Sequence, residues 1–458
     1  MKLGLGRPAL FARAFLLVNL LLLVVAILAV YEMQIADDNA YLGYRHVGTD
    51  PQQLLLLVAS VLVAGALLPV EIRRPSDFLS LFHILFVVLP YVALFPIGGP
   101  VAAAQYWLNF ATLLVPLLVV RLGTASAIGL RMPSPMSYGS LELAIVALCV
   151  LGTAYAFLHA PSSAGIDLAS TYDRRIEGRE IFQAGTPAAY LNAAIVNGFA
   201  PTAAFLGGWR RRNWLLFVAL ASGAAFYYVI GLKAPIFYVG LAYLVGYAIR
   251  MGAVGRFVAV LLGLLWLALL AAFVEYVASG YSYVADYFLR RVFAVPSFLM
   301  AAYFEFMFQD PFSGWRPELG FHAAEGITYF VGAAYLGVSG ANANTNAFLY
   351  QLAAGGLPGY LVTTLLVSGV FAYLDAAYRA GRNAGFAFLG FLYAALLVEQ
   401  AATTALASSG IGALILLVSL TRARGRPHDS SNANRSIAGN RPAGSATCAT
   451  PGNLTQGG

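Results

Sequence analysis

Charged residues are scarce in this sequence: they make up 10% of its 458 residues, whereas 60% of the residues are hydrophobic. A soluble domain carries about 25% charged residues, so the composition excludes a soluble protein and indicates an integral membrane protein. The mean hydropathy of +0.76 favours the same class.

Residues that form metal sites and disulfides are also scarce, with 2 cysteines and 5 histidines. No histidine stands beside a cysteine at the spacing of metal ligands, and Cys149 and Cys448 alone make no disulfide framework. The glycine-rich loop of nucleotide-binding proteins is missing as well. We therefore expect no metal, no cofactor and no ATP hydrolysis.

Hydrophobic runs long enough to cross a bilayer recur through the chain, since a transmembrane helix needs about 20 mostly apolar residues. We expect an all-α polytopic integral membrane protein with about twelve transmembrane helices. The predicted spans are 12–31, 52–70, 78–96, 101–120, 141–158, 187–206, 214–231, 234–250, 256–275, 355–374, 384–401 and 404–420. Two large external loops, at about 159–186 and 276–354, are expected to carry short amphipathic helices and the functional residues. The membrane domain ends at 421, and residues 422–458 are rich in Ser, Asn, Gly and Pro, which predicts a disordered cytoplasmic tail.

Arginines recur in alternate loops, for example at Arg73, at Arg121 and from Arg210 to Arg212. Because cytoplasmic loops of membrane proteins are enriched in Lys and Arg, this alternation places both termini in the cytoplasm. The net charge of +7 follows mostly from these loops. It indicates a lipid bilayer as partner and not a nucleic acid.

Six cations break the alternation because they fall on the predicted external side. They are Arg174, Arg175 and Arg179 in the first large loop, Arg290 and Arg291 in the second, and Lys233 in the turn 231-GLKAP-235. One interpretation pairs each arginine with a nearby carboxylate and lets the lysine reach the membrane surface. The other brings these cations together on an anion, since Arg makes bidentate contacts to phosphate and Pro235 begins a helix whose amino end attracts anions.

An anion at the outer face between membrane helices indicates a lipid diphosphate, and the sequence resembles the oligosaccharide repeat-unit polymerases (O-antigen polymerases, Wzy-like) and the related O-antigen ligases. The similar pieces are the basic residue in GLKAP, the segment 290-RRVFAVPSFLMAAYFEFM-307 followed by 309-QDPFSGW-315, the Asn-rich segment 340-GANANTNAFLYQLAAGGLPGYLVTTLL-366, and the twelve-span layout. Lys233 departs from the arginine that is commoner at this position, which keeps the charge but loses the bidentate fork.

The resemblance implies a glycosyltransferase of the bacterial inner membrane that builds a surface polysaccharide such as O-antigen, capsule or exopolysaccharide. A glycan on polyprenyl diphosphate would be transferred to a hydroxyl group of a new lipid-linked repeat unit. Lys233, Arg290 and Arg291 would bind the diphosphate, and Arg174, Arg175 and Arg179 would bind substrate. The family also implies a chain-length regulator as a possible partner.

The acceptor hydroxyl needs a general base, for which we assign His322 and Glu305 as catalytic candidates. Further external candidates are Glu177, Glu180 and Glu325. The alternative for His322 is a solvated loop histidine. For Glu305 it is an ion pair with Arg291 on a short surface helix at 296–308.

Three other functions stay open on the sequence. An O-antigen ligase would use the same donor, although its histidine before a late span is replaced here by Asn342, Asn344 and Asn346. A transferase with a polyprenyl-monophosphate donor would use the external pair Asp37 and Asp38, which otherwise serve as polar loop residues. A transporter or flippase would use ionisable groups such as Glu399 and the neighbouring Gln400.

Overall fold

The computed structural model describes residues 7–48, 50–125, 133–167, 174, 177–178, 180–183, 185–232, 234–309, 326–337, 342–381 and 383–422. Contacts divide the chain into the units Met1–Arg422 and Ala423–Gly458, and the second unit lies outside the described residues. Within the described residues the secondary structure is helical, apart from one isolated β-bridge between Met136 and Thr421.

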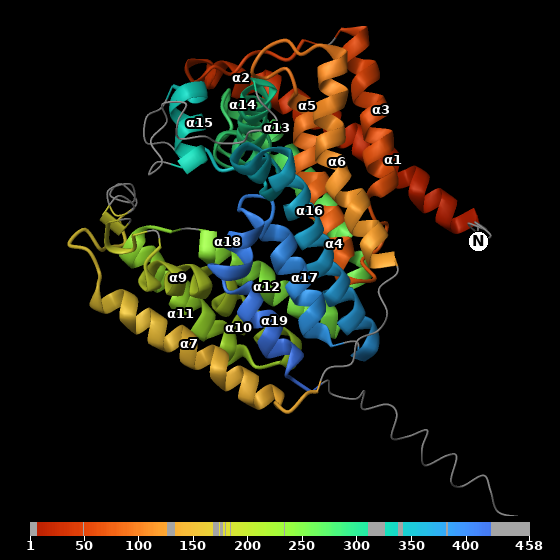
Figure 1. The fold of residues 1–458 in the computed structure, drawn as a ribbon. Helices are drawn as coiled ribbons and strands as arrows, with labels where there is room; N and C mark the ends of the chain where they lie inside the picture. The colour runs from red at the N-terminus through yellow and green to blue at the C-terminus, as the bar shows by residue number, and fades with distance from the viewer. Residues whose placement is uncertain are drawn as a thin grey trace, which may run out of the picture. The chain divides into compact units, whose positions relative to one another are not determined.

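Figure 1 shows the long and short helices in chain order. They are α1 (Arg7–Val30), α2 (Ala36–Asp38), α3 (Pro51–Leu67), α4 (Pro75–His83), α5 (Leu89–Leu94), α6 (Ala103–Ala125), α7 (Tyr138–Leu158), α9 (Pro187–Ala194), α10 (Ala200–Arg210), α11 (Asn213–Ile230), α12 (Ala234–Arg250), α13 (Phe257–Ser279), α14 (Val295–Gln309), α15 (Gly326–Leu336), α16 (Ala347–Gly381), α17 (Ala384–Leu396), α18 (Ala402–Ala407) and α19 (Ile411–Ser419). Wider π-helical turns join several of them: η1 (Tyr31–Ile35), η3 (Ile84–Val88), η4 (Ile195–Phe199) and η6 (Val284–Ala294). The 3-10 turns η2 (Ala40–Leu42) and η5 (Val254–Arg256) complete the described elements.

The chain is a multi-pass membrane protein, as its hydropathy predicted. Each predicted span falls on a helix or on adjoining helices, and eight described helical stretches are long and apolar enough to cross a membrane. These stretches are Leu10–Asp38, Pro75–Leu94, Ala103–Ala125, Tyr138–Leu158, Pro187–Arg210, Asn213–Ile230, Val254–Ser279 and Ala347–Gly381. Helix α17 has 13 residues and α19 has 9. At 1.5 Å per residue neither alone covers a hydrocarbon core of about 30 Å.

Arginines near the predicted cytoplasmic ends of helices contact the carboxyl ends of neighbouring helices. Arg13 donates hydrogen bonds to the carbonyls of Gly65 and Leu68 at the end of α3, at 2.8 and 2.5 Å. Arg379 donates to the Thr124 carbonyl of α6 at 2.6 Å. The last carbonyls of a helix lack the usual partner one turn further on, and a cation suits the negative end of the helix dipole.

Glycine lets α10 and α12 pack with their backbones in close contact. A Cβ atom placed on Gly208 would lie 2.2 Å from the Tyr243 carbonyl oxygen, and one on Gly246 would lie 2.3 Å from that of Phe205. Small residues at facing positions are the usual means of close helix packing in membranes. The end of α10 is also tied to α7, where the buried Glu142 accepts from Arg210 at 2.5 Å.

Helix α16 reverses direction at Gly356, where φ is 60° and ψ is −162°. The reversal brings Gly359 against the Gln351 carbonyl, although eight residues separate them in the sequence and a straight helix would hold them apart. The first arm therefore returns toward the helix bundle. In this arm the Phe348 ring packs against the His83 ring, with the two ring centroids 5.4 Å apart.

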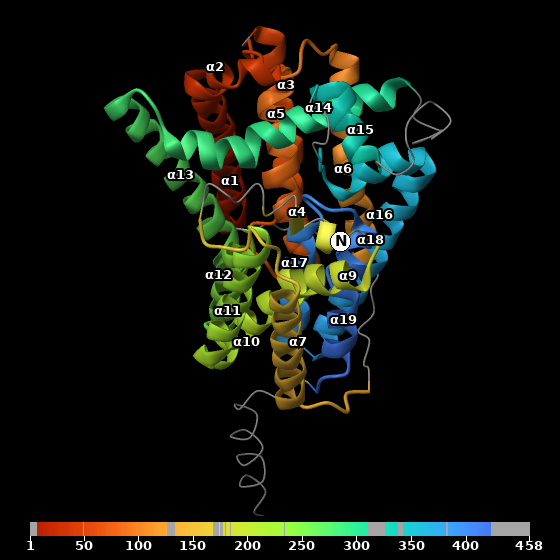
Figure 2. The ribbon, with the colours of Figure 1, turned by 90° about the vertical axis from the view of Figure 1, so that its left-hand side faces the viewer.

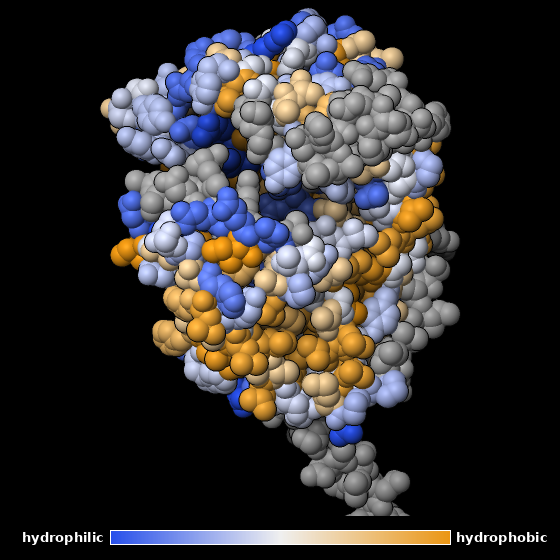
Figure 3. Space-filling view, turned by 60° about the vertical axis from the view of Figure 1, so that its left-hand side comes forward, coloured by the Kyte–Doolittle hydropathy of each residue, from blue (hydrophilic) through white to orange (hydrophobic). Residues whose placement is uncertain are grey.

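The segment η6–α14 lies across the ends of α1 and α5 and not parallel to them (Figure 2). The chain just before η6 is fastened to η1, because the Gln34 amide group exchanges two hydrogen bonds with the Ser282 backbone, at 2.7 and 3.2 Å. Apolar side chains cover much of the lower surface in Figure 3, and a hollow with hydrophilic walls opens above them. The crosswise α14 contains residues 296–308, for which the sequence predicted a surface helix.

Candidate functional site

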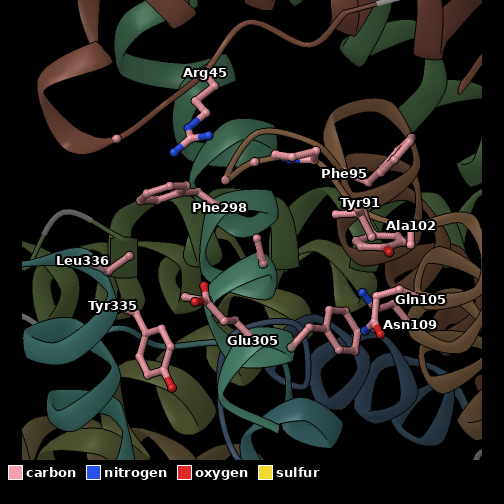
Figure 4. Close-up of a pocket in the computed structure, with 18 of the residues that line it drawn as sticks. Arg45, Tyr91, Phe95, Ala102, Gln105, Asn109, Phe298, Glu305, Tyr335 and Leu336 are labelled. Atoms are coloured by element: carbon pink, nitrogen blue, oxygen red, sulfur yellow. The ribbon is translucent and has the colours of Figure 1, made fainter. Parts of the chain in front are cut away.

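A pocket of about 600 Å³ lies between α14, the end of α15, α6 and the turns that follow α2 and α5 (Figure 4). Its polar lining side chains include Arg45, Gln105, Asn109 and Glu305. Pockets of about 300–1,000 Å³ with a few polar groups among apolar walls are typical of small-molecule sites. The sequence predicted Glu305 as a site residue but did not single out the other three.

Backbone contacts hold Arg45 at one side of this pocket. Its N–H donates to the Ile97 carbonyl at 3.1 Å, and its own carbonyl accepts from the Tyr31 hydroxyl at 2.6 Å. The exposed guanidinium group lies beside Gly99, where a Cβ atom would be 3.5 Å from Arg45 Nη1. The first predicted external loop, which lies between the predicted spans 12–31 and 52–70, is thereby fixed at Arg45 against the turn after α5.

Two carboxylates that precede Arg45 in the chain, Glu32 and Asp37, are bound by its neighbour His46. The two ring nitrogens of His46 lie 2.6 Å from Glu32 Oε2 and 2.9 Å from Asp37 Oδ1. The Glu32 hydrogen bond is the main cause that raises the pKa of His46 above its usual value, and the Asp37 bond adds to it. Among the described residues, no carboxylate lies within 4 Å of Arg45.

Glu305 reaches the pocket from α14, with Phe298 lying between it and Arg45 in Figure 4. Its side chain is exposed, and in the described part of the chain no ion pair joins it to Arg291. Fourteen residues of helix separate the two, which is about 20 Å at 1.5 Å per residue. The alternative of a Glu305–Arg291 ion pair is therefore wrong, and Glu305 is available to a ligand.

The remaining walls combine aromatic rings with a pair of amides. Phe95, Phe298 and Tyr335 line the pocket, and Gln105 Nε2 donates to Asn109 Oδ1 at 3.0 Å. Sugars offer both apolar ring faces and hydroxyl groups, so aromatic and amide side chains together suit a carbohydrate. The pocket therefore combines apolar and hydrogen-bonding walls with the carboxylate of Glu305.

Arg290 and Arg291 have different surroundings at the end of η6. Arg290 pairs with Asp286 at 3.1 Å and donates to Asn39 Oδ1 at 2.5 Å, whereas Arg291 is exposed. Burial raises the pKa of Tyr44 to about 12, and both nearby guanidinium groups oppose that rise. These two arginines and Arg45 thus gather around the first predicted external loop.

The first large predicted loop holds Arg174 in a structural setting. Its side chain is fully buried, donates to the carbonyls of Gly165 and, at 2.7 Å, Asp167, and lies 5.3 Å from the centre of the Tyr227 ring. These contacts favour loop stabilisation over substrate binding. The other predicted cations of this group, Arg175, Arg179 and Lys233, lie outside the described residues, as do the base candidates His322 and Glu325.

The structure also describes the residues that the alternative transferase and transporter functions would use. Asp37 binds His46, and Asp38 is exposed at the end of α2. Glu399 is exposed after the short helix α17 and accepts a hydrogen bond from the Tyr238 hydroxyl at 2.5 Å. Close by, the broken helix α16 begins with Ala347 N–H donating to the Leu397 carbonyl at 2.9 Å.

Sequence signals for the residues that were missed do exist. Gln105 and Asn109 stand four residues apart in an apolar span, so they share one helix face, and polar residues within spans tend to be functional. Arg45 stands in the first predicted external loop, which was considered only for its aspartates. Comparison with models of protein families, with curated proteins and with solved structures finds no match for this chain.

Proposed function

We propose that this protein is a polysaccharide polymerase of the bacterial inner membrane, which joins repeat units carried on polyprenyl diphosphate. The observation that supports it most is the exposed carboxylate of Glu305 in a pocket of about 600 Å³ with aromatic and amide walls. The proposal includes twelve crossings with both termini in the cytoplasm, which puts the pocket at the external face.

The proposed reaction transfers the growing glycan from its lipid carrier to the new unit. An acceptor hydroxyl oxygen attacks the anomeric carbon, Glu305 takes the hydroxyl proton, and polyprenyl diphosphate leaves with the electrons of the broken C–O bond. Charge grows on the leaving diphosphate, so fixed cations there stabilise the transition state more than the ground state. Arg291, with Lys233 and Arg290, has this role in the proposal, and His322 is the alternative base.

The test uses the full chain in nanodiscs with a synthetic polyprenyl-diphosphate repeat unit, without nucleotide sugar or metal. The wild type should produce a ladder of lengthening products. Glu305→Gln should slow the ladder about a hundredfold or more, because general-base catalysis contributes about 10²–10⁴-fold. Glu71→Gln, on the predicted cytoplasmic side, is the matched control and should leave it unchanged.

The outcomes separate polymerase from ligase. A wild-type protein that forms no ladder, but moves glycan to an added lipid core, is a ligase and not a polymerase. A ladder that is equally fast in Glu305→Gln removes Glu305 from the reaction, and His322→Gln is then the variant that tests the second base.

A transporter is the second candidate, and the broken helix α16 next to Glu399 is the observation that favours it, since transporters build their sites from discontinuous helices. Under the polymerase proposal Glu399→Gln leaves the ladder unchanged. Under the transporter proposal no ladder forms, and the same variant stops the movement of a fluorescent lipid-linked sugar across proteoliposomes.

A further inference from the structure

Arg45 is a cation in the lining of the pocket, and within the described part of the chain it has no ion pair. Its backbone is fixed through Ile97 and Tyr31, and its guanidinium group rests beside Gly99. His46 holds both Glu32 and Asp37, and no ion pair joins Arg45 to a carboxylate among the described residues. A guanidinium group on a fixed backbone suits an anionic group of a ligand, because its planar fork matches a carboxylate with two parallel hydrogen bonds.

The rest of the pocket limits which anion fits. Glu305 lines the same pocket with Phe298 between it and Arg45, so it repels a second negative charge and accepts hydrogen bonds from hydroxyl groups. The amide pair Gln105–Asn109 adds neutral hydrogen-bonding groups. The ligand therefore carries one negative group at the Arg45 side and hydroxyl groups at the Glu305 side.

We infer that this pocket recognises an acidic sugar, a pyranose that carries a carboxylate, such as a hexuronic acid. In a hexuronic acid the carboxylate on C5 lies across the ring from the hydroxyl groups on C2 and C3, which matches the opposed Arg45 and Glu305. The inference rests on the proposed function in one respect, namely that the sugar belongs to the acceptor repeat unit. Arg45 thereby selects acceptors, and Glu305 takes the proton of an acceptor hydroxyl.

A lipid diphosphate fits this pocket less well than a carboxylate. A diphosphate carries at least two negative charges, whereas the pocket lining offers one guanidinium group and one opposing carboxylate among the described residues. The exposed Arg291 and its neighbour Arg290 lie outside the pocket lining. The inference thus assigns the sugar carboxylate to Arg45 and the lipid diphosphate to Arg290 and Arg291.

The test measures sugar binding directly, by saturation-transfer NMR on the full chain in nanodiscs. The probes are methyl glucuronoside and methyl galacturonoside, with methyl glucoside and methyl galactoside as neutral controls and inorganic pyrophosphate as competitor. The acidic sugars should bind at least about tenfold more tightly than the neutral ones, since a hydrogen bond to a charged group contributes about 1.5–3 kcal/mol.

The variants Arg45→Gln and Arg45→Lys locate the selectivity. Arg45→Gln should reduce the preference for acidic sugars to about onefold, and Arg45→Lys should retain part of it because the charge stays but the fork is lost. Arg73→Gln, another exposed arginine on the predicted cytoplasmic side, should keep the wild-type preference. An unchanged melting temperature in each variant excludes misfolding as the cause.

Three results would overturn the inference. Equal binding of acidic and neutral sugars, or a preference that survives Arg45→Gln, shows that Arg45 does not recognise a carboxylate. Displacement of the acidic sugar by pyrophosphate at lower concentration, lost in Arg45→Gln, makes the pocket a phosphate site. These binding results do not depend on the ladder assay. Arg45-dependent sugar binding without a ladder would support the inference and contradict the polymerase proposal.

Discussion

His46 and Glu32 form a contact of 2.6 Å that links the first predicted external loop to the end of the first span. Together with Asp37 on its other nitrogen, Glu32 favours the charged form of the ring, so the pKa of His46 lies above its usual 6.5. A raised folded-state pKa stabilises the loop fully below the unfolded pKa, and this stabilisation is lost as the pH rises through the folded value.

We therefore predict that residues 39–48 loosen as the pH rises above 6.5, which hydrogen exchange followed by mass spectrometry measures as faster exchange beyond its intrinsic pH dependence. His46→Gln should remove this extra pH dependence. Because the pair is solvent-exposed, added salt should weaken the effect. A wild-type loop whose corrected exchange is constant from pH 6 to 9 would contradict the prediction.

Gly246 and Phe205 are in backbone contact, so a side chain at Gly246 forces α10 and α12 apart. We predict that Gly246→Ala lowers stability by about 1–3 kcal/mol, the usual cost of overpacking. Gly240→Ala is the matched control in the same helix, because a Cβ atom there has no neighbour within 4 Å. Thermal unfolding in detergent should show a lower melting temperature for Gly246→Ala alone, and equal effects of the two changes would refute the close packing.

The helices were predictable because hydrophobic run length is a strong local signal, and each predicted span falls on helical structure. The reversal in α16 was not, although Gly355, Gly356 and Pro358 mark the place. Glycine permits an unusual backbone without requiring it. Which glycine adopts it depends on contacts far along the chain, such as that between Ala347 and Leu397.

The candidate site was predictable only in part, for a related reason. Glu305 could be named because it is a carboxylate in a predicted external loop, where a general base is expected. Arg45 and Asn109 come from other parts of the chain, and they meet Glu305 only through the packing of α14 across α5 and α6. The sequence also could not show that Arg290 contacts Asp286 and Asn39 while Arg291 is exposed, because both residues carry the same charge.

Gly356 adopts backbone angles that are almost confined to glycine, with φ at 60° and ψ at −162°. We predict that Gly356→Ala lowers stability by about 1–3 kcal/mol. Gly369→Ala, in the straight part of the same helix and with open space around its Cβ position, should be neutral or slightly stabilising. Melting temperatures of the two variants test this, and a Gly356→Ala protein as stable as Gly369→Ala would show that α16 does not need the reversal.

Arg290 and Arg291 are adjacent in the sequence but have different contacts. We therefore expect a change at Arg290 to affect stability and a change at Arg291 to affect activity. Arg290→Gln removes the contacts with Asp286 and Asn39 and should lower the free energy of unfolding by about 1–3 kcal/mol.

Arg291→Gln should leave the melting temperature unchanged, because this exposed side chain has no ion pair among the described residues. In the proposed polymerase it should slow ladder formation about tenfold to a thousandfold, since a charge that stabilises a leaving group acts mainly in the transition state. Rates and melting temperatures of the two variants, measured side by side, test both halves. If Arg291→Gln polymerises at the wild-type rate, Arg291 does not serve the diphosphate, and Lys233 becomes the cation to test next.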